Sequence, residues 1–269
     1  MDPRNKNSAG ARGNTFRNLR VLALLLVLLA VSLQAWVAGY ESTRWVDPLF
    51  VAIYPIAADA SPATARYLAS LDKQRFAPID RFFAREAHRY GVKESAPVKT
   101  RLRPALHELP PEPPAGGGMF ATAVWSLRLR FWAWTHSGNA GEPEDIRMFV
   151  LYCDPALTPT VPHSLGLQKG LIGVVYAFAT PTMDGANDVV IAHELMHTLG
   201  ATDKYDPATD APRFPDGYGD PNQLPLYPQR KAELMAGRRM LSPSRWVEPA
   251  SLDEVVIGPA SALEIRWMR

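Results

Sequence analysis

The sequence predicts a mixed α/β domain that follows a single transmembrane helix. Three observations lead to this prediction: a charge-free apolar run at residues 21–39, several short apolar runs rich in strand formers, and longer segments with helical spacing. With 269 residues, of which 47% are hydrophobic and 21% charged, the chain is able to bury a sizeable core. Its 25 prolines exclude a coiled coil or an all-helical repeat array.

The first forty residues contain the segment that is predicted to cross a membrane. Residues 1–20 are basic and are expected to form a cytoplasmic tail, and residues 21–39 are long enough to cross a bilayer as one helix. Trp36 and Ala38 make a poor cleavage site, which favours an uncleaved anchor in the cytoplasmic (inner) membrane over a cleaved signal peptide and secretion. Both alternatives place residues 40–269, the expected catalytic domain, outside the cytoplasm.

Charge and cysteine content narrow the function classes. The formal net charge is +2, but residues 1–20 hold five of the 29 basic residues and one of the 27 acidic ones, so the remainder is slightly acidic. This balance argues against a nucleic-acid-binding surface. The single cysteine, Cys153, excludes an internal disulfide framework and a cysteine-based zinc cluster, and its place at the end of an apolar run indicates a packing role.

The first half of the domain is predicted to contain a strand, a helix and a second strand. Residues 49–54 (LFVAIY) form an apolar run closed by Pro55, and they predict the first strand. Residues 77–90 present one apolar helical face and end at Gly91, where a left-handed residue often stops a helix. Residues 98–106 are expected to add a second strand. The proline- and glycine-rich stretch at 104–118 predicts a connecting loop.

The middle of the chain contains one ambiguous segment and two clear strands. Residues 119–134 lack a helix breaker and fit a helix, although their centre also alternates like a strand, and their aromatic residues are expected in the core. Residues 146–152 (IRMFVLY) and 171–179 (LIGVVYAFA) predict buried strands. The turn-rich sequence PTMDGAND then leads into the segment that carries the chemistry.

Residues 191–203 read IAHELMHTLGATD and contain the pattern His-Glu-x-x-His. On a helix, His193 and His197 point the same way, so that both imidazoles are able to bind one metal ion. Glu194 projects beside them and reaches a metal-bound water as a general base. Asn187 or Asp188 is the expected N-cap of this helix.

The residues after the second histidine complete a ligand set. Gly200 provides the left-handed residue at which the helix stops and the chain turns back. Asp203 follows as an oxygen ligand, and His193, His197 and Asp203 supply the three protein ligands that a hydrolytic zinc site requires. The nearby Tyr205 and Asp206 remain alternative third ligands. A polar core without metal would need a hydrogen-bond network that the sequence does not reveal.

The segment HELMHTLGATD resembles the metzincin-type zinc peptidases, in the branch whose third ligand is an aspartate. The resemblance covers roughly residues 171–240 and implies a mixed sheet with an active-site helix, a methionine turn beneath the zinc, and an edge strand that pairs with extended substrates. Met235 in AELMAGR is the candidate for that turn, with Met240 as a competitor, and residues 171–179 resemble the edge strand. The absence of a glutamate between Glu194 and Glu233 argues against a thermolysin-like third ligand.

Other polar residues lie outside the His-Glu-x-x-His segment and follow no recognised ligand spacing. His163 precedes the predicted edge strand and is a candidate for oxyanion stabilisation, although a lone loop histidine is usually structural. The loop at 206–228 holds four aspartates among turn formers, without a recognised calcium spacing. Its tyrosines, together with Tyr205, offer hydrogen-bond donors for a tetrahedral intermediate, and the sequence does not choose among them.

The apolar run at 21–39 predicts a membrane anchor, and the resemblance implies a zinc-dependent endopeptidase that hydrolyses peptide or protein substrates. In it, His193, His197 and Asp203 hold Zn²⁺ and Glu194 activates the water. The alternative from another class is a non-catalytic envelope protein that keeps a structural metal site and binds a partner. The sequence leaves the natural substrate and the oligomeric state open.

Overall fold

The computed structural model describes residues 17–22, 25, 43–114, 116, 118–138, 141 and 143–268. Its centre is a five-stranded sheet with the order β2-β1-β3-β5-β4. The strands are β1 (Leu49–Ala57), β2 (Val98–Leu102), β3 (Ile146–Cys153), β4 (Leu165–Leu167) and β5 (Ile172–Phe178). All neighbours pair in parallel except β4, which runs antiparallel to β5. The expected mixed sheet is therefore present.

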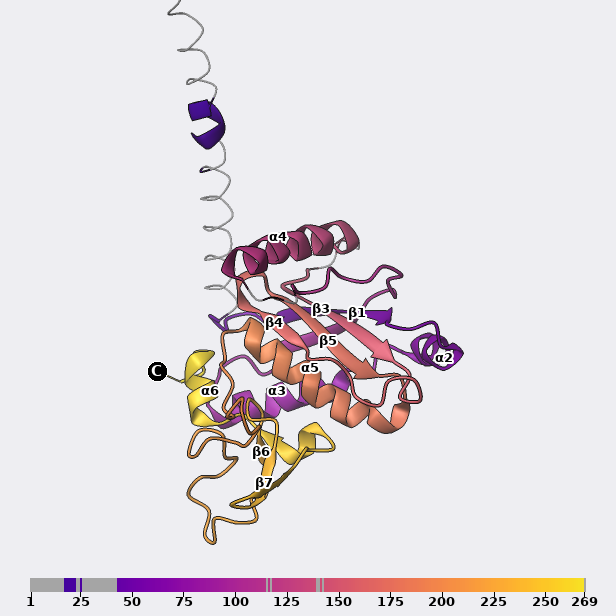
Figure 1. Cartoon of the computed structure of the whole chain (residues 1–269). Coiled ribbons are helices and arrows are strands. Elements are labelled where there is room, and N and C mark those ends of the chain that lie inside the picture. Colours follow the sequence, from indigo (N-terminus) through magenta and orange to yellow (C-terminus); the bar gives the residue numbers. More distant parts are fainter. Residues whose placement is uncertain are drawn as a thin grey trace, which may run out of the picture.

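Helices cover both faces of this sheet (Figure 1). One face packs against α2 (Pro62–Ser70), α3 (Ala77–Arg89) and α5 (Asp184–Thr198), and the other face packs against α4 (Met119–His136). β1 shows why its sequence is continuously apolar: Val51 and Ile53 belong to the α3/α5 core, whereas Ala52 and Tyr54 belong to the α4 core. A strand buried on both faces needs no polar alternation.

Most of the elements expected in this half of the domain are confirmed. The helix expected at 77–90 is α3, and Gly91 follows it with a φ of +69°. The strands expected at 49–54, 146–152 and 171–179 are β1, β3 and β5. The strand expected at 98–106 ends at Leu102 because Pro104 offers no backbone donor, and pairing then survives only as an isolated bridge.

The ambiguous segment at 119–134 is the helix α4, which corrects its strand-like interpretation. Trp125, Leu129 and Trp132, spaced four and three apart, lie on the sheet together with Ala133. This spacing buries one helical face, whereas a strand would have exposed every second residue. The expectation that its aromatic residues belong to the core is confirmed for Trp125 and Trp132 and is wrong for Phe120, Phe131 and Trp134, which are exposed.

The C-terminal part folds into short elements next to the end of α5. They are β6 (Ala232–Glu233), β7 (Arg239–Ser242), β8 (Arg245–Val247), β9 (Val255–Val256) and α6 (Pro259–Glu264), together with a 3-10 turn at Leu252–Glu254. Two other 3-10 turns precede α5: Gln168–Gly170 lies between β4 and β5, and Pro181–Met183 lies between β5 and α5. β6 pairs in parallel with β9, and β7 forms an antiparallel pair with β8. These elements supply backbone groups and two carboxylates, those of Glu233 and Glu264, to the site described below.

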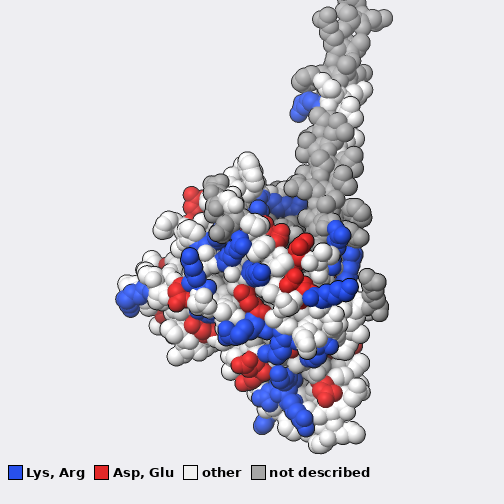
Figure 2. Space-filling view, turned by 180° about the vertical axis from the view of Figure 1, so that it is seen from behind, with Lys and Arg blue, Asp and Glu red and all other residues white. Residues whose placement is uncertain are grey.

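Most of the run at 21–39 lies outside the described residues, and so does the expected transmembrane helix. Among the residues that the structure does describe, no helix is both long enough and apolar enough to span a bilayer. On the face shown in Figure 2, Lys and Arg side chains are interspersed with Asp and Glu. Such mixing of signs on this face is in keeping with the near-neutral charge of the domain.

Candidate metal centre

The helix α5 carries the two histidines. It begins at Asp184, directly after the 3-10 turn at Pro181–Met183, so the expected N-cap at Asn187 or Asp188 is wrong. Both side chains have tertiary partners instead: Asn187 exchanges two hydrogen bonds with the backbone of Phe178, and Asp188 forms a 2.7 Å ion pair with Arg75. These contacts fix the first turns of α5 against the sheet and against the turn that precedes α3.

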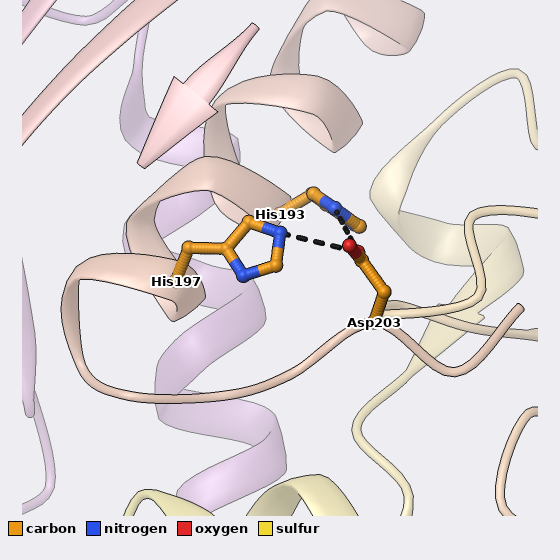
Figure 3. Close-up of side chains that lie close together, drawn as sticks. All are labelled: His193, His197 and Asp203. Carbon is orange, nitrogen blue, oxygen red and sulfur yellow. Dashed lines mark ion pairs between the residues drawn. The ribbon is translucent and has the colours of Figure 1, made fainter. Parts of the chain in front are cut away.

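His193 and His197 lie four residues apart on α5, with their ring centroids separated by 4.7 Å (Figure 3). The Nδ1 atom of His193 lies 2.9 Å from the carbonyl oxygen of Leu234, and that of His197 lies 2.9 Å from the carbonyl oxygen of Ala201. A carbonyl only accepts hydrogen bonds, so each Nδ1 donates. In the neutral rings, each Nε2 is then an unprotonated ligand atom, as in most histidine metal sites.

Asp203 completes the group. α5 stops at Thr198, Gly200 adopts a φ of +101°, and the chain turns back so that Asp203 faces both rings. Its Oδ1 atom lies 3.2 Å from the Nε2 atom of His193 and 3.2 Å from that of His197. These are the only three residues, among those described, whose His, Cys, Asp or Glu ligand atoms cluster within 4.8 Å of one another.

The group fits a zinc ion. Two ligand atoms placed about 2.0–2.1 Å from a tetrahedral zinc lie about 3.3 Å apart, close to the observed 3.2 Å separations. Two nitrogens and one carboxylate oxygen also suit zinc chemically, and three protein ligands leave a fourth position open. Burial raises the pKa of Asp203, but the adjacent imidazoles outweigh it and hold that pKa well below its ordinary value.

Electrostatics couple the second histidine to this carboxylate. Burial lowers the pKa of His197, but hydrogen bonds to Asp203 and to the carbonyl of Ala201 outweigh it and raise that pKa overall. The pocket therefore favours positive charge at His197, beside the Asp203 carboxylate. A divalent cation satisfies the same preference.

Glu194 lies beside the histidines with an unsatisfied carboxylate. Its side chain is buried, with an exposure of 6%, and its Oε2 atom has no hydrogen-bond partner. Burial raises the pKa of Glu194, and the neighbouring imidazoles counteract this only in part. Buried polar atoms are normally paired, so this oxygen is available for a ligand or a proton.

Strand β4 packs directly against the site, and its position shows that one expectation is wrong. The segment expected to be the edge strand, residues 171–179, is β5 and lies inside the sheet between β3 and β4. The edge is β4, which has only three residues, one of them a glycine, and therefore gives no strand pattern in the sequence. A Cβ atom on Gly166 would come within 2.5 Å of the His197 Cβ atom and 3.2 Å of the Glu194 Oε2 atom.

A buried turn supports the ligands from below. Glu233 begins it and Gly237, with a φ of +65°, ends it, and the Leu234 carbonyl between them accepts the His193 hydrogen bond. The carboxylate of Glu233 accepts hydrogen bonds from the backbone amides of Ala236 and Gly258 and from the Ser261 hydroxyl. The turn is thereby tied to the start of α6.

The far end of α6 holds the loop that carries Asp203. Glu264 accepts hydrogen bonds from the amide and hydroxyl of Thr202, at 2.9 and 2.7 Å, and from the ammonium of Lys204, at 2.7 and 2.8 Å. The residues on both sides of Asp203 are therefore fixed by one carboxylate. Neither Glu233 nor Glu264 was singled out from the sequence, because each lies 30 or more residues from the ligands that it supports.

The competing ligands lie elsewhere. Tyr205 is half-buried beside Asp203, and Asp206 uses its carboxylate to accept the Ala208 amide, so neither belongs to the three-residue group. Met235 is fully buried within the supporting turn, whereas Met240 lies on β7. The position of the turn favours Met235 as the methionine beneath the site.

The remaining candidates do not join the group. His163 is exposed in the loop before β4. In the loop at 206–228, Asp210 pairs with Arg238, and the hydroxyls of Tyr218 and Tyr227 lie 2.9 Å apart. The first contact ties the loop to Arg238 in the C-terminal part, and the second lies within the loop.

Comparison with known proteins does not identify this chain. No protein-family model matches its sequence, and a search of curated proteins finds no significant match. The function therefore has to be inferred from the chemistry of the site.

Proposed function

We propose that this chain is a zinc-dependent endopeptidase in which His193, His197 and Asp203 hold the metal and Glu194 is the general base. One observation carries the proposal: the buried Oε2 atom of Glu194 has no partner, and beside it the Asp203 Oδ1 atom lies 3.2 Å from each of two imidazole Nε2 atoms, a spacing that suits a tetrahedral zinc. A purely structural site commonly uses four protein ligands and has no need of an unpaired carboxylate. The proposal extends to a metzincin-like active-site arrangement.

In this proposal the residues of the site have three roles: they bind the metal, orient the ligands and transfer a proton. The two Nε2 atoms and the Asp203 Oδ1 atom bind the ion, while the Leu234 and Ala201 carbonyls keep the imidazoles oriented. Zinc bound there would supply Lewis acidity toward a scissile carbonyl and toward a water molecule. Glu194 accepts the proton of the attacking water at its carboxylate and passes it to the leaving amine. The raised pKa of Glu194 makes its carboxylate a better proton acceptor.

The edge strand supports a peptide as the substrate. β4 is the last strand of the sheet, and it crosses directly over Glu194 and His197. Its outer backbone groups are available to an extended chain, which would add a strand to the sheet and lay its peptide bond across the site. This arrangement supports an endopeptidase that recognises main-chain groups.

The location is part of the same proposal. The apolar run at 21–39 would anchor the chain in the cytoplasmic membrane and place the domain outside the cytoplasm. If the run is cleaved as a signal peptide, the same domain is secreted.

A chelator and an inhibitor together test the proposal. The purified full chain should hydrolyse a mixed peptide library, lose that activity in a strong chelator, and recover it when zinc is added back. A peptide hydroxamate, which needs the open fourth position, should raise Tm of the zinc-loaded protein. A protein that binds zinc but neither cleaves peptides nor responds to the hydroxamate would instead be the non-catalytic envelope protein with a structural metal site.

A further inference from the structure

The outer face of α4 is an apolar stripe without a partner among the described residues. We define the apolar stripe as five side chains spaced four, three, four and three residues apart: Phe120, Val124, Leu127, Phe131 and Trp134. Four of them are more than half exposed, with 82% for Phe120, 57% for Leu127, 65% for Phe131 and 68% for Trp134. Single exposed apolar residues are ordinary, but a continuous row of large ones along a helix marks an interaction site.

The charged side chains of α4 are all basic. Between Glu112 and Glu142 the sequence contains no acidic residue, while α4 carries Arg128 and Arg130. Arg128 is exposed beside the apolar stripe. The exposed Glu108 pairs with His136 at the C-terminal end of α4, so an acidic group is present at that end, but the helix itself carries only basic charges. An apolar helical face with aromatic residues and flanking arginines suits a surface that is apolar inside and anionic at its rim.

The C-terminal end of α4 lies at the same end of the sheet as the start of β1, which follows the expected membrane anchor in the sequence. The apolar run ends at residue 39, and β1 begins at Leu49, so about ten residues join them, which reach at most about 35 Å. The chain that leaves α4 returns to the same end of the sheet, where Gly138 donates to the Tyr54 hydroxyl and Asp145 to the Phe50 carbonyl. α4 is itself only about 27 Å long.

We propose that the apolar stripe of α4 lies on the surface of an anionic lipid bilayer, next to the transmembrane segment expected at 21–39. Phe131 and Trp134, toward the C-terminal end of α4, would enter the interface where aromatic rings are favoured, and Arg128 would contact lipid phosphates. Because α4 and α5 pack on opposite faces of the sheet, this contact turns the metal centre away from the bilayer (Figure 1). The domain would thus present its site to substrates outside the membrane.

Site-directed fluorescence on the full chain tests this proposal. The only native cysteine, Cys153, is buried, so a Cys153→Ala background accepts one introduced cysteine at a time. Leu127→Cys places a polarity-sensitive fluorophore on the apolar stripe. Leu157→Cys is the matched control, because Leu157 is 65% exposed but follows the C-terminal end of β3, away from the end where the chain enters the sheet. If Leu127→Cys fails to fold, Phe131→Cys replaces it.

The labelled chains are reconstituted into phosphatidylcholine vesicles with and without phosphatidylglycerol, each containing a nitroxide-labelled lipid. The proposal predicts that the Leu127 fluorophore shifts to the blue and loses intensity to the nitroxide, more strongly with phosphatidylglycerol, while the Leu157 fluorophore does neither. Equal signals from the two positions would overturn it. A Leu127 signal that ignores the nitroxide and rises with the protein-to-lipid ratio would also overturn it, and would assign the apolar stripe to a second copy of this chain.

Discussion

Two buried glutamates, one on α5 and one in the turn beneath it, show how the same side chain serves opposite purposes. Glu233 is fully buried and accepts hydrogen bonds from Ala236, Gly258 and Ser261. Glu194 is also buried, yet its Oε2 atom has no partner. A satisfied buried carboxylate stabilises a fold, whereas an unsatisfied one costs free energy that only a functional role explains.

The largest effect is the loss of peptide hydrolysis expected in Glu194→Gln. This change keeps the shape of the side chain but removes the proton acceptor, so hydrolysis of a test peptide should fall by about 10²–10⁴-fold. Zinc content and Tm should stay at the wild-type level, because the carboxylate supports neither the ligands nor the fold. Retained hydrolysis would contradict the role of Glu194. Glu248→Gln, at an exposed glutamate, is the matched control.

Glu233→Ala is expected to lower the stability of the fold, which Glu194→Gln leaves unchanged. It leaves the Ala236 and Gly258 amides and the Ser261 hydroxyl without their acceptor, and each such buried donor costs about 1–3 kcal/mol. The free energy of unfolding, measured in urea, should drop by at least about 3 kcal/mol. An unchanged stability would show that the comparison between the two glutamates is wrong.

A smaller effect is expected at the strand that covers Glu194. In Gly166→Ala the new methyl group would meet the His197 Cβ atom at 2.5 Å, so β4 has to move away from α5. Such overpacking typically costs about 1–3 kcal/mol and should reduce hydrolysis along with stability. Gly116→Ala is the control, because nothing lies within 4 Å of its position. Equal behaviour of the two variants would argue against close packing of β4 on the site.

The smallest effect is expected for Glu264, which holds the loop of Asp203 from the exposed end of α6. Burial raises the pKa of Glu264, but hydrogen bonds from Lys204 and Thr202 outweigh it and place that pKa below the ordinary 4.5. The lowered value means that the stabilisation is present above pH 4.5 and is lost as the pH falls through the folded-state pKa.

Wild type should therefore be more stable than Glu264→Gln at neutral pH, and the difference should disappear in acid. Urea unfolding of both proteins across this pH range measures it. A difference that does not change with pH would contradict the ion pair as its source. The variant should also bind zinc more weakly, which competition with a chromogenic chelator detects.

The sequence predicted those features that depend on local pattern. Continuous apolar runs identified β1, β3 and β5, and the spacing of His193, His197 and Asp203 identified the group that the structure brings together. What it missed depends on distant partners. Asn187 and Asp188 resemble N-caps, but contacts with β5 and Arg75 place them inside α5.

Other features had no local signal at all. β4 is too short to stand out, and it is a strand only because β5 lies beside it. Glu233 and Glu264 look like ordinary acidic residues until the fold brings them next to the turn and the loop that they hold. The exposed side of α4 was also unpredictable, since its aromatic residues are divided between core and surface.

The central claim is that three side chains hold one zinc ion. Plasma mass spectrometry of the dialysed full chain, beside its His197→Ala variant, tests it most directly. The account predicts about one zinc per wild-type chain and a collapse of that content in the variant. Equal metal content in the two proteins, or no retained zinc in the wild type, would contradict it.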